Sequence, residues 1–419
     1  MLSRFLSIST TNFCNANNNG NANNNNASNT NGVVPDSLIG SQQTIVCDSN
    51  LLKKETGILR SGENRDHDGC CSTKSRSSYQ HDSFFLLTDP LNLLYAYQES
   101  KKGVSWKYSI QKYEQHLIKN ISDTIKTLEQ GEIVTKGFFE FDINERGKNR
   151  HIKSVHISER VVQKALCNQI LTPILSKSLI HDNGASLQGK GTSFTRDRIK
   201  VHLMRHYRKY GTAGYIVLLD CRKYFDSIEH SILYPMIDKQ INDKKTSGIV
   251  HKYIDEFGDK SLGLGSQVSQ ITAIFFPNSI DHYAKENLHL KQYGRYMDDS
   301  YFIVPTKEEA QEKLFLLSKK YDSLGIPLNL HKTQIVKLTR NFTFMKCIYR
   351  ISGTGKILIH PDKAGLKRMC TKLKKFKEMG LPLNQVDLAY KAWKGHWISL
   401  NGDSRKAELL YSRLYGEAS

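Results

Sequence analysis

Hydrophobic residues are sparse over the first 80 positions of the chain and become periodic from position 84 onward. Residues 15–32 are mostly Asn with Ala, Gly, Ser and Thr, and the stretch that follows stays polar and rich in Gly and Ser. Such a composition cannot bury enough apolar surface to offset the entropy lost on ordering. We therefore predict a disordered tail over residues 1–80.

Helical spacing of apolar residues dominates the next part of the chain. Order is expected from Phe84, and Asp89-Pro90 is a helix-start signal because Pro suits the first turn. The spacing predicts two helices before Gly131 and another over residues 158–179, with Ser158 as its N-cap. After a short loop at 189–192, helical spacing resumes through Tyr210.

Strand patterns separate these helices. Residues 138–143 and 150–155 predict a hairpin whose polar turn covers 144–149. The apolar run at 215–219 indicates a buried strand that ends at Asp220. Residues 294–304 predict two short strands with Met297-Asp298-Asp299 at the tip of their turn.

The adjacent carboxylates of Asp298 and Asp299 repel each other unless a cation lies close to them. Hard oxygen ligands of this kind suit Mg²⁺. The alternative is an ordinary polar turn, since Asp is common in turns. Asp220 changes the balance, because a third carboxylate at a strand end would let the group hold two Mg²⁺ ions about 4 Å apart, as two-metal nucleotidyl transfer requires.

The charge of the chain favours a polyanionic partner. Sixty Lys and Arg stand against 41 Asp and Glu, which gives a net charge of +19. An excess of this size is typical of nucleic-acid-binding proteins, although a basic protein without such a partner is the alternative.

Cysteine usage and hydropathy bear on the compartment. The eight cysteines show no C-x-x-C pair and no zinc-type spacing, as expected for reduced thiols in a cytoplasmic protein. No apolar run approaches the roughly 20 residues that span a bilayer, so we expect no membrane partner.

Five motifs in order resemble those of the reverse transcriptases, most closely the prokaryotic ones. They are Lys148-x-Arg150 followed by Ser158–Gln163, the strand ending in Asp220-x4-Phe225-Asp226, Gly265–Gln270, Tyr296-Met297-Asp298-Asp299, and Leu324-Gly325-Ile326-Pro327-Leu328-Asn329 with Lys332-Thr333. The resemblance as a whole runs from about residue 84 to about 415.

The resemblance implies an α+β right-hand polymerase fold. It would consist of N-terminal helices and fingers over 81–212, a palm of antiparallel sheet plus helices over 213–350, and a small helical, basic thumb over 351–419. The implied activity is RNA-directed DNA synthesis from dNTPs on an RNA template with a DNA or RNA primer. An accessory nucleic-acid-binding protein is a further candidate partner.

The resemblance also implies roles for single residues. Asp220, Asp298 and Asp299 would be catalytic and would hold two Mg²⁺, with Mn²⁺ as the alternative ion. Lys332 would act as general acid near the departing pyrophosphate, although a surface lysine is the alternative.

The implied nucleotide-binding residues lie in three segments. Lys148 and Arg150 would hold the triphosphate through charge-assisted bonds, with a solvated turn as the alternative. Phe225 falls at the steric gate, where an aromatic ring would collide with a 2′-hydroxyl; a core Phe is the alternative. The other positions are Cys221, Tyr224, Leu264, Gly265 and Gln270.

Leu264 marks a departure, because many reverse transcriptases have Gln at this position. An apolar residue here, with Ser269-Gln270 ending the segment, is similar to the enzymes of diversity-generating retroelements, which copy adenines with errors. Phage-defence and other bacterial reverse transcriptases share parts of the pattern. A template-independent transferase on the same scaffold is the enzymatic alternative, and a catalytically silent nucleic-acid-binding protein is the alternative that is not an enzyme.

The C-terminal part would contact primer and template. The primer-grip positions are Phe344, Met345 and Lys346, where alternating aromatics are also typical of a core. A basic amphipathic helix follows over 363–377, with seven Lys or Arg and no acid. We expect its apolar side to pack on the palm and its basic side, rather than a membrane, to meet phosphates; its predicted contact residues are Lys367, Arg368, Lys372, Lys374 and Lys375.

Overall fold

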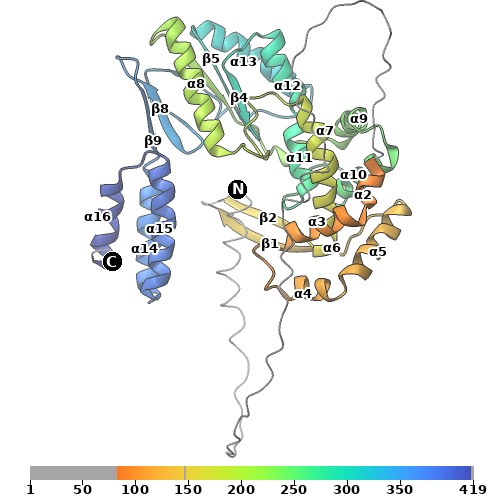
Figure 1. The fold of residues 1–419 in the computed structure, drawn as a ribbon. Coiled ribbons are helices and arrows are strands. Elements are labelled where there is room, and N and C mark those ends of the chain that lie inside the picture. Colours follow the sequence, from red (N-terminus) through yellow and green to blue (C-terminus); the bar gives the residue numbers. More distant parts are fainter. Residues whose placement is uncertain (1–82, 146–147, 417–419) are drawn as a thin grey trace, which may run out of the picture. The chain divides into compact units, whose positions relative to one another are not determined.

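The computed structural model describes residues 83–145 and 148–416 (Figure 1). The tail predicted over 1–80 and the centre of the predicted hairpin turn, residues 146–147, lie outside the described residues. Four cysteines lie within them, and all four are free thiols: Cys167, Cys221, Cys347 and Cys370.

The described chain begins with four helices. These are α2 (Ser83–Thr88), α3 (Pro90–Lys101), α4 (Tyr108–Gln115) and α5 (Leu117–Glu129). The predicted start of α3 is confirmed, because the Asp89 side chain accepts a 2.9 Å hydrogen bond from the N–H of Leu91. The prediction of two helices before Gly131 is wrong: the left-handed turn at Gly103 (φ 74°) and the non-helical His116 divide the region further.

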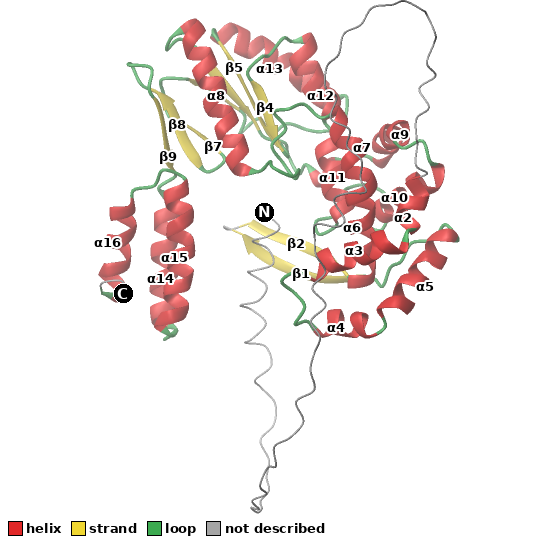
Figure 2. Ribbon diagram, in the orientation of Figure 1, coloured by secondary structure: helices red, strands yellow, loops and turns green. Residues whose placement is uncertain are grey.

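The predicted hairpin is confirmed as a separate two-stranded sheet, yellow in Figure 2. β1 (Phe138–Glu145) pairs antiparallel with β2 (Lys148–Val155), so each strand extends two residues further toward the turn than predicted.

The helical run after the hairpin starts one residue earlier than predicted. It comprises α6 (Ile157–Leu166), a π-helical turn (Cys167–Leu171), α7 (Thr172–Leu175) and a 3-10 turn (Ser176–Ser178). Its N-cap is His156 rather than Ser158, because Nδ1 of His156 accepts a 3.2 Å hydrogen bond from the N–H of Ser158. An imidazole nitrogen here does what a Ser or Asp oxygen usually does.

A four-stranded antiparallel sheet in the order β4-β5-β3-β6 carries the acidic residues. Its strands are β3 (Tyr215–Leu219), β4 (Tyr293–Tyr296), β5 (Asp299–Val304) and β6 (Gln334–Lys337). Alternate residues of β3 enter different cores: Ile216 and Leu218 join the cluster that contains α8 (Thr192–Tyr210), whereas Val217 and Leu219 join the one that contains α13 (Lys307–Asp322). Burial on both faces explains why β3 is apolar throughout.

Helices fill the chain between β3 and β4. They are α9 (His230–Gln240), α10 (Lys244–Asp255), α11 (Gln267–Phe275) and α12 (Asn278–His282), and a π-helical turn (Tyr283–Asn287) follows. A short 3-10 turn, Phe225–Ser227, precedes α9.

The C-terminal part combines a small sheet with three helices. β7 (Phe342–Phe344), β8 (Cys347–Ile351) and β9 (Ile357–Pro361) form an antiparallel sheet, so the predicted boundary at 350/351 falls inside β8. α14 (Ala364–Glu378), α15 (Leu383–Ser399) and α16 (Ser404–Tyr415) contact one another and lie side by side in Figure 2. Their shared core contains Met369, Leu373, Val386, Tyr390 and Tyr411.

The fold is therefore mixed α and β with antiparallel sheets, as predicted. Within the part of the chain that the structure describes, no helix is both long enough and apolar enough to span a membrane.

Candidate active site

The end of β3 and the acidic turn lie beside each other at one edge of the four-stranded sheet. β3 pairs with β5 in a register that sets Leu219 opposite Ser300. One further step along this register brings Asp220 level with Asp299, and Asp298 precedes Asp299 in the turn. Opposite residues of an antiparallel pair have Cβ atoms about 5 Å apart. The backbone therefore brings together three acids from distant parts of the sequence.

Cys221 lies buried among these acids. Its thiol donates a 3.3 Å hydrogen bond to the carbonyl oxygen of Asp298. Burial raises the pKa of Cys221 well above its usual range, and the negative charges of Asp298, Asp299 and Asp220 also raise it. A thiol held neutral in this way supports the turn and is not a nucleophile.

Asp220 has a cationic partner and an amide partner. The ammonium group of Lys332 donates to both carboxylate oxygens, at 3.2 and 3.1 Å, and the side-chain amide of Asn329 donates at 3.1 Å. The backbone N–H of Asn329 also donates to the Asp220 carbonyl oxygen at 2.7 Å. The Leu-Asn-x-x-Lys segment thus lies directly against the end of β3.

The donor chemistry of this edge suits a divalent cation, but the side chains do not converge on one point. Among residues 83–145 and 148–416, no three His, Cys, Asp or Glu side chains form a group that could hold a metal ion as they are oriented. The Lys332 ammonium supplies positive charge to Asp220 where a metal would supply it. A divalent ion therefore fits the placement of the acids if it displaces Lys332 and the carboxylates rotate toward it.

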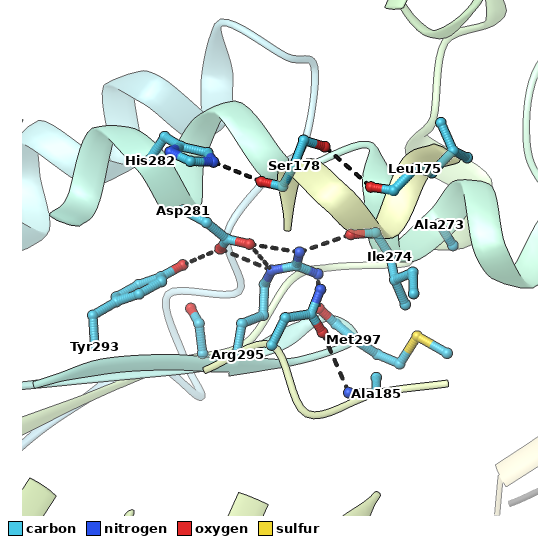
Figure 3. Close-up of polar contacts among 12 residues, drawn as sticks. Leu175, Ser178, Ala185, Ala273, Ile274, Asp281, His282, Tyr293, Arg295 and Met297 are labelled. Atoms are coloured by element: carbon cyan, nitrogen blue, oxygen red, sulfur yellow. Dashed lines mark hydrogen bonds and ion pairs between the residues drawn. The ribbon is translucent and has the colours of Figure 1, made fainter. Parts of the chain in front are cut away.

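Arg295 is bonded to the first residue of the acidic turn, Met297, and to residues of two helices, as Figure 3 shows. Its guanidinium donates to both carboxylate oxygens of Asp281, to the carbonyl oxygen of Ile274 at 2.8 Å and to that of Met297 at 3.1 Å. Asp281 also accepts a 2.7 Å bond from the Tyr293 hydroxyl. Arg295 and Asp281 are 1% and 0% exposed, so this pair is shielded from water.

The Met297 carbonyl belongs to a strained residue. Met297 has φ 54°, in the left-handed region that costs a non-glycine residue about 1–2 kcal/mol. The hydrogen bond from Arg295 helps to hold this conformation, and through it the position of Asp298. The same guanidinium reaches α11 at Ile274 and α12 at Asp281, so Arg295 links the acidic turn to both helices.

Phe225 and its neighbours differ in their access to solvent. The Phe225 ring is half-buried and meets the ring of Tyr224 edge-on, with centroids 5.6 Å apart. Tyr224 is buried and its hydroxyl donates to the Ala273 carbonyl oxygen of α11. The side chains of Tyr224 and Cys221 are both buried, so the nucleotide contact predicted for these two residues would have to involve their backbone atoms.

The loop before α11 lies directly against the hairpin. The N–H of Lys153 in β2 donates to the Leu264 carbonyl oxygen at 3.2 Å. Gly265 has φ 128°, and a Cβ there would lie 2.3 Å from the Lys153 carbonyl oxygen, so only glycine fits. Leu264 is half-buried, and the side-chain amide of Gln270 donates to the Ser186 hydroxyl at 2.9 Å.

The two basic residues predicted to hold the triphosphate lie on β2 of this hairpin. Lys148 is the first residue of the strand, and the half-buried Arg150 pairs with Ile143 of β1. The contact at Gly265 therefore connects their strand to the start of α11.

A buried polar chain joins α6 to the same loop. The side-chain oxygen of Gln163 accepts from the Ser266 hydroxyl and the Gln267 N–H, at 3.0 and 3.1 Å, and its amide donates to Glu159 at 2.8 Å. Burial, with the nearby charge of Glu256, raises the pKa of Glu159 to about 8. This carboxyl group is therefore largely protonated at neutral pH.

The predicted primer-grip residues form the β7–β8 turn. Phe344 is buried and meets Tyr301 of β5 edge-on at 5.1 Å. Met345 and Lys346 form a two-residue turn in which both φ angles are positive, 48° and 65°, as in a type I′ hairpin.

The basic helix α14 exposes every residue that the sequence singled out there: Lys367, Arg368, Lys372, Lys374 and Lys375. Its apolar residues pack on α15 and α16, not on the four-stranded sheet, which corrects the prediction that they would cover the palm. The physical reason is the length of the C-terminal segment, which supplies two further amphipathic helices.

Comparison with known proteins settles the family. The model of the family described as "Reverse transcriptase (RNA-dependent DNA polymerase)" matches residues 136–349, which are 214 of the 419 residues. The chain belongs to the reverse transcriptase family. The matched range of this reverse transcriptase contains both the edge with the three acids and the Gly265 loop, and members of the family use divalent metal ions.

Solved structures similar to this reverse transcriptase include telomerases. Apo telomerase from Candida tropicalis, truncated from the C-terminal domain, is 15% identical over 59% of this chain and 60% of that chain, with a TM-score of 0.42. Telomerase from Candida albicans with a TWJ fragment of telomeric RNA is 13% identical over 70% of this chain and 62% of that one, with a TM-score of 0.46. The chain thus spans about three fifths of their length. Among the curated proteins no match is found.

The predicted family and the α+β polymerase fold of helices and small antiparallel sheets are confirmed, whereas the subgroup, the domain limits and the roles of single residues stay predictions. The residues that hold the site in place were not predicted from the sequence: Arg295, Asp281 and the side chain of Asn329. A charged residue between apolar neighbours in a predicted strand was a usable signal for Arg295.

Proposed function

We propose that this protein is an RNA-directed DNA polymerase that copies an RNA template into DNA by adding dNTPs to a primer 3′-hydroxyl. The observation that supports the proposal best is the register of β3 and β5, which brings Asp220 beside Asp299 within the matched range. A family match alone would leave open whether these acids are neighbours.

In this mechanism Asp220, Asp298 and Asp299 would hold Mg²⁺, or Mn²⁺ as the alternative. When bound, the ions lower the pKa of the primer hydroxyl and neutralise charge on the triphosphate. The primer 3′-hydroxyl would lose its proton to solvent as its oxygen forms a bond to the α-phosphorus, while the bond from that phosphorus to the oxygen bridging to the β-phosphate breaks and pyrophosphate leaves.

The remaining side chains have separate tasks. Lys332, once displaced from Asp220, would give a proton to the departing pyrophosphate, as a general acid does. Lys148 and Arg150 would bind the triphosphate through charge-assisted hydrogen bonds. The half-exposed ring of Phe225 would exclude a 2′-hydroxyl and so favour dNTPs.

Template and primer would be held by the C-terminal part. The exposed basic residues of α14 suit phosphate contacts, which would make binding weaker at high salt. The turn at Met345 and Lys346 follows Phe344, whose ring contacts Tyr301 of the four-stranded sheet. The 3′ end of a primer would have to lie near this sheet to reach the three acids.

Primer extension tests the proposal directly. Wild-type protein with poly(rA)/oligo(dT), Mg²⁺ and dTTP is expected to extend the primer, and Asp298→Ala is not. Product formed without any template would indicate a template-independent transferase. Absence of product with the wild type, in Mg²⁺ and in Mn²⁺, would indicate a silent nucleic-acid-binding protein.

Within this function we infer an error-prone enzyme of the kind found in diversity-generating retroelements. The support is Leu264, whose half-buried apolar side chain stands where many relatives have Gln. Loss of a polar contact to the base pair that is being formed reduces the difference in binding free energy between the complementary nucleotide and a mismatched one. Leu264→Gln is expected to lower misincorporation opposite template adenine, measured by sequencing the cDNA; an unchanged error spectrum would contradict this subgroup and favour a phage-defence or other bacterial reverse transcriptase.

A further inference from the structure

A cavity lined by cations lies away from the acidic edge, between the N-terminal helices and the base of the hairpin. It is a cavity of about 390 Å³ lined by residues of the α4 start, β1, β2 and the α6 start. Three cations and one histidine line it, and no Asp or Glu is among the lining residues in the described chain: Lys107, Lys136, Arg160 and His156.

The positive charges in this cavity lack a full counter-charge. Burial and the charge of Arg160 lower the pKa of Lys107, and burial with Lys136 and Arg160 lowers that of His156. The acid that acts on Arg160 is its neighbour Glu159, whose own pKa is raised to about 8, so at neutral pH it is mostly uncharged. Like charges crowded in a partly buried space are stabilised by a bound anion.

The backbone around the cavity also favours an anion. The first turns of α4 and α6 both line it, and the α4 cap residue, Lys107, makes no capping hydrogen bond through its side chain. Helix N-termini carry partial positive charge and N–H groups without an intrahelical acceptor. His156 accepts a backbone N–H at Nδ1, so the proton of the neutral ring is on Nε2, which can donate.

Aromatic rings beside the cations indicate what kind of anion fits. Phe138 and Phe139 of β1 line the cavity, and Phe139 is 60% exposed. Exposed aromatics next to a basic groove are how proteins bind single-stranded nucleic acid, because bases stack on the rings while cations hold the backbone. A site for inorganic phosphate alone would gain nothing from an exposed ring.

We propose that this cavity binds a phosphate group of single-stranded nucleic acid, through Lys107, Lys136 and Arg160, with an adjacent base stacked on Phe139. The site goes beyond the proposed polymerase function, since it shares no residue with the acidic edge and needs neither metal nor dNTP. It would hold a strand against the outside of the fingers hairpin.

The test compares two variants with the same reduction in charge. Lys107→Gln/Lys136→Gln removes two cations from the cavity, and Lys119→Gln/Lys126→Gln removes two exposed lysines from α5, outside the cavity. Binding of a labelled single-stranded oligoadenylate RNA to the full chain is measured by fluorescence anisotropy, without dNTP. We expect the cavity variant to bind about tenfold more weakly, which corresponds to about 1.4 kcal/mol for removing charge-assisted hydrogen bonds. Its log–log salt slope should fall by about 0.7 for each phosphate that the variant no longer neutralises.

Equal weakening in the two double variants would mean that only the overall charge matters and would overturn the site. Phe139→Ala tests whether the bound phosphate belongs to a nucleic-acid strand or is free phosphate. Weaker RNA binding by this variant supports a nucleic-acid strand, whereas unchanged RNA binding overturns the proposed stacking of a base on Phe139. Inorganic phosphate is expected to raise the thermal midpoint of the wild type relative to chloride at equal ionic strength, and not that of the cavity variant. If the variant responds as the wild type does, the cavity is not a phosphate site.

Folding and polymerase activity are recorded separately. The cavity variant should keep the circular dichroism spectrum and melt no earlier than the wild type, because it relieves charge repulsion. Lack of primer extension by all proteins would overturn the proposed function and leave the binding comparison intact.

Discussion

Two aspartate–cation pairs lie close to the acidic turn, and they are built differently. Asp281 and Arg295 are buried, share a two-pronged hydrogen bond and also engage Tyr293 and two backbone carbonyl groups. Asp220 and Lys332 are 22% and 51% exposed in their side chains and are joined by one flexible ammonium group.

We call the buried pair of Asp281 and Arg295 the permanent pair, and the exposed pair of Asp220 and Lys332 the exchangeable pair. A buried ion pair is costly to break because the remaining charge cannot regain water. An exposed pair contributes little and forms and separates readily. Arg295 therefore suits the task of fixing the turn, whereas the exposed pair of Lys332 and Asp220 can separate at little cost.

The largest expected effect is on catalysis at the exchangeable pair. Asp220→Asn keeps the shape of the side chain but removes its charge, so primer extension should fall by about 10³-fold or more, a loss of about 4 kcal/mol in transition-state stabilisation. Asp322→Asn on α13, an exposed acid away from this edge, is the matched control and should stay within twofold of the wild type. Near-normal activity of the Asp220 variant would remove Asp220 from the mechanism.

Breaking the permanent pair should mainly affect folding. Arg295→Met leaves the Asp281 charge buried without its partner, which should lower the free energy of unfolding by about 3–5 kcal/mol, measured by urea denaturation. Adding Asp281→Leu removes the stranded charge and should recover part of the loss. A loss below about 1 kcal/mol for the single variant would show that the pair is not the main support of the turn.

A buried acid whose pKa is raised despite a neighbouring arginine, Arg160, extends the comparison. The pKa of Glu159 is raised by burial and by Glu256 to about 8 from an ordinary 4.5. Between these values the unfolded state releases the proton first, so the carboxyl group lowers stability as pH rises from 4.5 to 8. Glu159→Gln keeps the acceptor for Gln163 and should stabilise the protein at pH 8 by about 1–2 kcal/mol, with no gain below pH 4.5. The same gain at both pH values would contradict this account.

The smallest effect on stability is expected at Lys332. Lys332→Met should change the free energy of unfolding by less than about 1 kcal/mol, because its pair with Asp220 is exposed. If the lysine and the metal compete for Asp220, the Mg²⁺ concentration for half-maximal extension should fall in this variant, even as the rate falls with loss of the general acid. A rise in the required Mg²⁺ concentration would show that Lys332 helps metal binding instead.

The sequence was enough to predict which strands carry the acids. A continuous apolar run ending in Asp220, and a turn holding Asp298 and Asp299, identify strand ends because side-chain patterning follows burial. The motif order then gave the family. The sequence did not show that Asp220 lies beside Asp299; this was predicted because two-metal catalysis needs the acids close together. The register of β3 and β5 shows that the backbone brings the two residues level with each other.

The supports of the site could not be read in the same way. Arg295 meets Asp281 and the Ile274 carbonyl group through tertiary packing, and no local spacing rule connects them. The N-cap at His156 was missed because propensity favours Ser158. The apolar face of α14 was recognised, but sequence periodicity says only that a helix has such a face and not which helices will cover it.

Gly265 has a consequence for how this protein can vary. Since the Lys153 carbonyl oxygen would lie 2.3 Å from a Cβ at position 265, any residue other than Gly would push the hairpin and the start of α11 apart. Substitution of Gly265 is therefore expected to shift β2 relative to this loop, whereas substitution of the half-buried Leu264 leaves its main-chain hydrogen bond with Lys153 in place.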